Sequence, residues 1–138
     1  MNEVKPIDAQ ELLEQIIPGN RLILKLQSCM KDLDFPGVTL SHKNKVGIQA
    51  FKDDIQRYID HLIAQRERLI RLVKQIPDVE IQLVLQLRYG LLGNETKKMS
   101  WLDIPPLLNY EMDTLYKRHR KGIDYLNTIL GNGGENQC

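Results

Sequence analysis

The feature that most constrains the fold is a long heptad pattern in the middle of the chain. Apolar residues recur at alternating spacings of three and four from Ile48 to Ile76, and Gln65 interrupts that row as a polar residue. Pro77 ends the pattern, because proline lacks a backbone N–H and clashes with the preceding turn. A helix of this span is about 43 Å long at 1.5 Å per residue. That length suits a helical hairpin or a coiled coil.

The residues before this pattern predict two shorter helices that fold back on the long one. Helical spacing runs from Ile7 to Ile17, with Asp8 as the N-cap, and continues from Asn20 to Leu33. Pro18-Gly19 lies between the two segments as a break or a bend. Residues 34–47 contain a proline, two glycines and mostly polar side chains, so we expect a connection there.

The last third of the chain predicts three further helical segments. Asp78 is a candidate N-cap for a helix from Val79 to Tyr89, which is too rich in apolar residues for a surface helix. A turn from Gly90 to Lys98 precedes a short segment from Ser100 to Leu108, and the final helix runs from Glu111 to Leu130. The alternation typical of strands is nearly absent, so the expected fold class is all-α.

The short segment and the final helix together have the outline of a helix-turn-helix. Ser100 with Asp103 resembles a capping box, and Asn109 can adopt the left-handed conformation of a tight turn. Pro105-Pro106 leaves two starting points open for the short helix. A start at Ser100 would lose the Pro105 hydrogen bond, whereas a start near Pro105 would place the prolines in the first turn, where they are tolerated.

Three regions follow from this layout: a helical hairpin or coiled coil over residues 1–77, a helix-turn-helix domain over 78–130 and a disordered polar tail over 131–138. A two-helix hairpin would leave four apolar positions of the long helix partly uncovered. A stripe that wide usually packs on another helix, so we expect a homodimer. The four positions are Ile59, Ile63, Ile70 and Val73.

The final helix carries the candidate site. A step of about 100° per residue separates an apolar side, with Leu115 and His119, from a polar and basic side. Such polar and basic groups are what a recognition helix presents to base edges and phosphates. Arg118 lies at the border, where its stem can pack while the guanidinium reaches solvent. The candidate DNA-binding residues are Asp113, Thr114, Lys117, Arg118, Arg120 and Lys121.

Residues 78–126 contain motifs that resemble region 4 of bacterial sigma factors. In chain order these motifs are LRYGLL, MSWLDI, LLNY and LYKRHRKGIDYL. The layout of about residues 8–130 is more similar still to phage-encoded late-transcription regulators of the ArpU and RinA type. The resemblance implies a transcription regulator in the cytoplasm of a bacterial host cell. Its ligand would be double-stranded promoter or operator DNA, and host RNA polymerase is a candidate partner.

The chain departs from this family at three places. Pro105-Pro106 replaces helix-forming residues, Arg118 replaces an apolar residue, and Glu111 replaces a small N-cap. A carboxylate at Glu111 suits the helix dipole but repels a phosphate. From Arg88 to Lys121 seven basic and four acidic residues give a net charge of +3. That charge is low for tight DNA binding by one module at physiological salt.

Other classes of protein are disfavoured by composition and motifs. The net charge of the whole chain is +1, so it is not a polycation that coats nucleic acid. No apolar run approaches the ~20 residues that span a bilayer, and the first nine residues lack the features of a signal peptide. Cys29 and Cys138 have no metal-ligand spacing with the histidines, and no catalytic pairing is evident. We therefore expect no membrane association, cofactor, metal or enzymatic activity.

A protein-interaction module is the alternative function. In that case the heptad helices would bind a host protein, and the helix-turn-helix would serve as scaffold. Pro105-Pro106 and the low net charge favour this alternative, whereas the polar composition of the final helix favours DNA. We interpret His119 as a packed histidine and Trp101 as a core anchor. Gln65 has two interpretations: it determines the register or oligomeric state of the heptad helices, or its side chain simply reaches solvent.

A strip of basic residues on the long helix also has two readings. It could bind phosphates, but a solvated helix face is the interpretation that we favour. The strip consists of Arg66, Arg68, Arg71 and Lys74.

Overall fold

The computed structural model describes residues 8–34, 42–93 and 95–135, and every regular element in these ranges is a helix. The predicted all-α class is therefore confirmed for the described part of the chain. None of the described helices is both long enough and apolar enough to cross a membrane. The helices are α1 (Ala9–Glu14), α2 (Ile16–Leu33), α3 (His42–Lys74), α4 (Val79–Tyr89), α5 (Ile104–Leu108) and α6 (Met112–Glu135).

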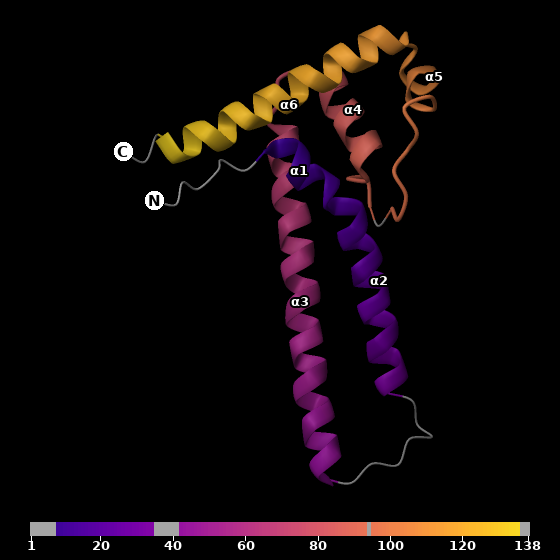
Figure 1. The fold of residues 1–138 in the computed structure, drawn as a ribbon, viewed down its shortest axis with the longest axis vertical. Coiled ribbons are helices and arrows are strands. Elements are labelled where there is room, and N and C mark those ends of the chain that lie inside the picture. Colours follow the sequence, from indigo (N-terminus) through magenta and orange to yellow (C-terminus); the bar gives the residue numbers. More distant parts are fainter. Residues whose placement is uncertain (1–7, 35–41, 94, 136–138) are drawn as a thin grey trace, which may run out of the picture.

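The molecule has a long shaft and a head at one end of it (Figure 1). We call the pair α2 and α3 the shaft, and α1, α4, α5 and α6 with the last turns of α3 the head. The two shaft helices run antiparallel and side by side, and α6 crosses the head end of the shaft at a steep angle (Figure 1). Among the described residues away from the head, a thin row of side chains, Ile23, Ile55 and Ile59, is buried between the shaft helices.

The core of the head is larger and draws on five helices, since Ile16 of α2 joins residues of α1, α3, α4 and α6. Leu13 of α1, Val73 of α3, Leu85 of α4 and Leu126 of α6 are each buried to within 1% of complete burial in the same cluster. This cluster joins residues on both sides of position 77, where we predicted a boundary between two regions. The boundary stays a prediction, but the two sides share one core.

The burial of the long helix differs from the sequence-based expectation. Ile59 and Val73, which we expected to be partly uncovered, are buried in the shaft and in the head. Ile63 and Ile70 are half-buried. Two of the four positions behind the expected homodimer are therefore covered within one chain: Ile59 packs against Ile23 of α2, and Val73 lies in the cluster that α1 and α6 share with α3.

An aspartate caps the first helix, and a proline lies in the first turn of the second. Asp8 caps α1 as predicted, and its Oδ1 accepts a hydrogen bond from the Gln10 N–H at 3.2 Å. The break between α1 and α2 falls at Gln15, so a break at Pro18-Gly19 is wrong, whereas the alternative of a bend there stays a prediction. Pro18 lies in the first turn of α2, where its missing N–H has no helical partner to lose.

Two segments that we predicted to be irregular are partly helical. Residues 42–47 belong to α3, while 35–41 of the predicted connection lie outside the described residues. Residues 131–135 continue α6 into the predicted disordered tail, and 136–138 lie outside the described residues. Each residue added to an existing helix forms one further backbone hydrogen bond. The glycines in these segments therefore weaken the helices but do not end them.

Helix α4 has the predicted bounds, and two glycines fix its surroundings. Asp78 Oδ1 caps it by accepting from the Glu80 N–H at 2.9 Å. Gly90 ends it with a left-handed φ of 72°, and a Cβ there would lie 2.3 Å from Ile17 Cδ1. A Cβ on Gly122 of α6 would lie 2.8 Å from Ile81 Cγ2, so α6 and α4 are in very close contact.

Candidate functional site

The corner between α5 and α6 is built by proline and asparagine. Helix α5 begins at Ile104, so Pro105 and Pro106 lie in its first turn, and the later of the two open starting points is the one observed. The predicted capping box is wrong, because Ser100 Oγ accepts from the Leu102 N–H at 3.2 Å and Asp103 makes no capping bond. Asn109 ends α5 with φ 59° and ψ 46°, which confirms the predicted left-handed turn.

A small apolar cluster lies beneath this corner. Val84 of α4, Ile104 of α5 and Leu115 of α6 are fully buried in it, so three helices share one contact point. The flanking side chains are Leu87, Met99, Trp101, Leu108, Tyr110 and Met112. The cluster holds the first turns of α6 against α4 and α5, and it thereby fixes which side of α6 faces outward.

His119 packs inward, as we predicted, within a group of aromatic side chains. Its Nε2 is 2.6 Å from the Tyr89 hydroxyl, and its ring meets Trp101 edge to face at 4.8 Å between centroids. The guanidinium of Arg88 lies 4.2 Å from the Trp101 ring centre and donates to the Met99 carbonyl oxygen at 2.6 Å. These contacts anchor the loop before α5 to both α4 and α6.

Burial sets the protonation of this group. Burial, and next the nearby Arg88 guanidinium, lower the pKa of His119 from its ordinary value of 6.5. Burial, and next the Glu14 carboxylate, raise the pKa of Tyr89 to about 12. At neutral pH the pair is therefore a neutral imidazole and a neutral phenol that share a hydrogen bond.

The outward side of α6 gathers most of the predicted site residues. Lys117, Arg120 and Lys121 are exposed and line one open hollow, together with Asp113, Asp124 and Tyr116. Thr114 is half-buried and does not line this hollow. Sequence reasoning missed Tyr116, although its spacing from Asp113 and Arg120 places all three on one helix face.

Arg118 points to a different neighbour. Its guanidinium donates to Asp78 Oδ2 at 2.9 Å, lies 3.4 Å from Glu80 Oε2 and sits 5.5 Å from the centre of the Tyr110 ring. The side chain is 30% exposed, and its guanidinium is held in ion pairs at the surface. Arg118 links α6 to the first turn of α4 and is turned away from the other predicted site residues.

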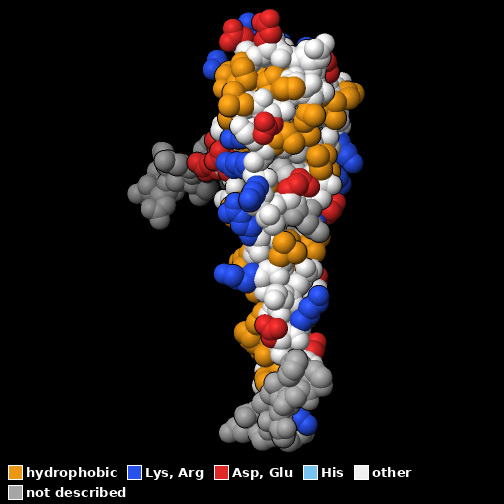
Figure 2. All heavy atoms as spheres, turned by 90° about the vertical axis from the view of Figure 1, so that its right-hand side faces the viewer, with side chains coloured by type: hydrophobic (Ala, Val, Ile, Leu, Met, Phe, Trp, Pro, Cys, Tyr) orange, Lys and Arg blue, Asp and Glu red, His pale blue; other side chains and the backbone are white. Residues whose placement is uncertain are grey.

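The opposite side of the corner is apolar. Leu102 and Leu107 are 74% and 61% exposed, and α5 has the sequence IPPLL, with no charged residue. The face in Figure 2 looks onto α5 and the loop before it, and hydrophobic side chains gather over this upper part of the molecule. A helix that faces solvent seldom exposes so many apolar side chains together.

We searched the site for metal ligands and compared the chain with known proteins. Among residues 8–34, 42–93 and 95–135, no three His, Cys, Asp or Glu side chains come together in a way that could hold a metal ion. Comparison of the chain with protein-family models, with curated proteins and with solved structures finds no match. The function must therefore be inferred from the side chains themselves.

Proposed function

We propose that the chain is a DNA-binding transcription regulator in which α5 and α6 form a helix-turn-helix and α6 is the recognition helix. The observation that carries this proposal is the two-sided character of α6. Its inner side is buried at Leu115 and Leu126, while Lys117, Arg120 and Lys121 stand together on the outer side. A basic helix face held rigidly outward is what major-groove recognition requires.

The acidic residues at the start of α6 determine how it would approach DNA. Glu111 and Asp113 precede the basic group, and both would repel a phosphate. The second and third turns of α6 would therefore enter the groove, with Lys117 at a base edge and Lys121 at a phosphate. The regulator would act at a promoter or operator of a phage genome in a bacterial host cell, with host RNA polymerase as a partner.

Fluorescence anisotropy with the DNA upstream of the chain's own gene tests this proposal. Lys117→Ala should cost ~1 to 3 kcal/mol of binding free energy and relax the sequence preference. Lys121→Ala should weaken binding to every sequence and reduce the salt-dependence slope by about one. Lys25→Ala is the matched control, because it removes the same charge from an exposed position on α2.

The DNA proposal fails if both α6 variants remain folded and bind cognate DNA as the parent does. It also fails if Lys25→Ala weakens binding as much as Lys117→Ala, because the interaction would then depend on total charge alone.

A protein-interaction module is the second candidate function. We had assigned that role to the heptad helices, but the apolar surface of Leu102, Pro106 and Leu107 is a further observation in its favour. A helix without basic residues is poorly suited to contact the DNA backbone. Leu107→Asp separates the two candidates: it should abolish polymerase-dependent binding while leaving binding to bare DNA unchanged, if this surface contacts a protein.

A further inference from the structure

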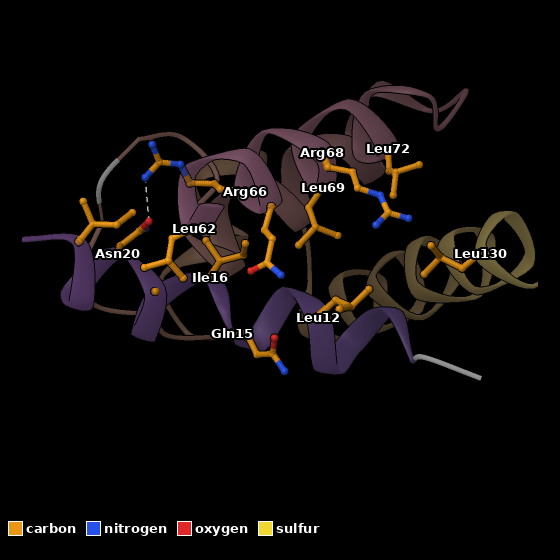
Figure 3. Close-up of a pocket in the computed structure, with 13 residues that line it drawn as sticks. Leu12, Gln15, Ile16, Asn20, Leu62, Arg66, Arg68, Leu69, Leu72 and Leu130 are labelled. Carbon is orange, nitrogen blue, oxygen red and sulfur yellow. Dashed lines mark hydrogen bonds between the residues drawn. The ribbon is translucent and has the colours of Figure 1, made fainter. Parts of the chain in front are cut away.

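Two hollows lie between α2 and α3 on one face of the shaft, and we call this face the groove. At the head end it is a cavity of about 70 Å³ between α2 and α3, closed at one end by Leu130 of α6. Figure 3 shows Leu62, Leu69 and Leu72 of α3 facing Leu12 and Ile16 across this space. A second hollow, lined by Leu22, Leu26, Phe51, Asp54, Ile55 and Tyr58, lies toward the far end of the shaft.

Helical spacing places both hollows on the same side of the shaft. On α3, Tyr58, Leu62 and Gln65 follow one another at intervals of four and three and connect the two hollows. On the opposite wall of the groove, the residues of α1 and α2 include Gly19, which has no side chain. A Cβ on Gly19 would meet only Leu62 Cδ2, at 4.0 Å, so the groove has room there for an incoming side chain.

The two ends of the groove differ in charge and in shape. Arg68 lines the head end and Asp54 lines the far end, where it pairs with Arg57 of the same helix. Phe51 and Tyr58 are both 51% exposed at the far end, so aromatic rings project there while the head end is hollow. An antiparallel copy of the shaft would therefore bring each aromatic end to a hollow end.

We propose that this groove binds the shaft of a second copy of the chain, antiparallel, to form a four-helix bundle. A two-fold axis near His61 and Leu62 pairs Asp54 with Arg68 of the second copy. The same axis sets Tyr58 opposite Gln65 of the second copy, beside the space at Gly19. A parallel arrangement would instead oppose Asp54 to Asp54, so the charges select the antiparallel one. This inference does not depend on DNA binding.

Charge reversal tests both the occupant and its orientation. Sedimentation of the full chain over a concentration series should show a dimer, and Asp54→Lys or Arg68→Glu alone should weaken dimerisation on the order of tenfold. The double variant Asp54→Lys/Arg68→Glu should return to within about threefold of the parent, because the pairs are restored with opposite sign. Asp53→Lys is the matched control: the same charge change on an adjacent exposed residue outside the groove should leave dimerisation within about twofold.

Gly19→Leu gives an independent readout that does not disturb the fold. The added side chain should occupy the cavity, raise the melting temperature of the monomer and weaken the dimer on the order of tenfold or more. A parent chain that remains a monomer at high micromolar concentration overturns the proposal and leaves the groove to a foreign helix. A double variant that dimerises no better than either single variant overturns the antiparallel pairing.

Discussion

The head and the shaft bury very different amounts of apolar surface. In the head, side chains from α1, α3, α4 and α6 meet in one cluster of buried residues. Among the residues described in the shaft beyond the head, three isoleucines form the buried cluster between two helices. Because apolar burial is the main favourable term in folding, the global stability of the chain resides in the head.

The difference also separates two tasks. A well-buried head can hold a surface helix in one orientation, as the cluster under the α5–α6 corner holds the first turns of α6. A thinly buried shaft opens locally at low free energy, and it gains most from a partner that covers it. Three perturbations test this division, beginning with the one expected to have the largest effect.

Truncation of one core residue in each region should give different kinds of loss. Leu85→Ala should lower the global free energy of unfolding by about 2 to 5 kcal/mol, because Leu85 is fully buried between α4 and α6. Ile59→Ala should instead accelerate amide exchange along α2 and the first half of α3, with a smaller global loss. Urea unfolding and hydrogen exchange measure the two effects. Equal global losses would show that the shaft and the head unfold as one unit.

A methyl group added to α6 should be costly on one side of the helix and harmless on another. Gly122→Ala should destabilise the chain by about 1 to 3 kcal/mol, because its Cβ would lie 2.8 Å from Ile81 Cγ2 and 2.9 Å from Leu85 Cδ1. Gly131→Ala is the matched control, since nothing lies within 4 Å of its added Cβ. It should be neutral or stabilise α6 by up to about 1 kcal/mol. A destabilising Gly131→Ala with a silent Gly122→Ala would contradict the close α4–α6 contact.

Acid should weaken the head through His119. The folded chain keeps this imidazole neutral and holds its pKa below 6.5, so the unfolded chain binds the proton more readily. Stability should therefore fall as the pH drops below about 6.5. His119→Gln should flatten this decline in denaturant unfolding from pH 7.5 to 5.5. An unchanged slope in His119→Gln would assign the acid sensitivity to other groups.

Local signals predicted much of the fold. The heptad row predicted the body of α3, the Asp78 cap and Gly90 predicted the bounds of α4, and Asn109 predicted the corner before α6. Each of these features depends on a few neighbouring residues, so the sequence contains the whole cause. The polar side of α6 was predictable for the same reason, since helical spacing alone groups Lys117 with Lys121.

Contacts between distant segments were not predictable in this way. Arg118 lies 40 residues from Asp78, and no local pattern indicates that their side chains meet. The burial of Val73 depends on α1 and α6, which join α3 only in the folded head. The early start of α3 at His42 was missed for a different reason, because the mostly polar sequence of residues 42–47 offers no apolar period to detect.

Asn20 is a buried polar residue whose side chain links the shaft to the head. It is 2% exposed, its Nδ2 donates to the Glu95 carbonyl oxygen at 2.8 Å, and its Oδ1 accepts from Arg66 at 2.8 Å. One short amide thus joins α2, α3 and the loop that leads to α5, and both of its ends are satisfied in only one rotational setting. These two hydrogen bonds therefore restrict the orientation of the shaft relative to the head. Two chains joined through their shafts would hold their α6 helices at one separation and one relative angle.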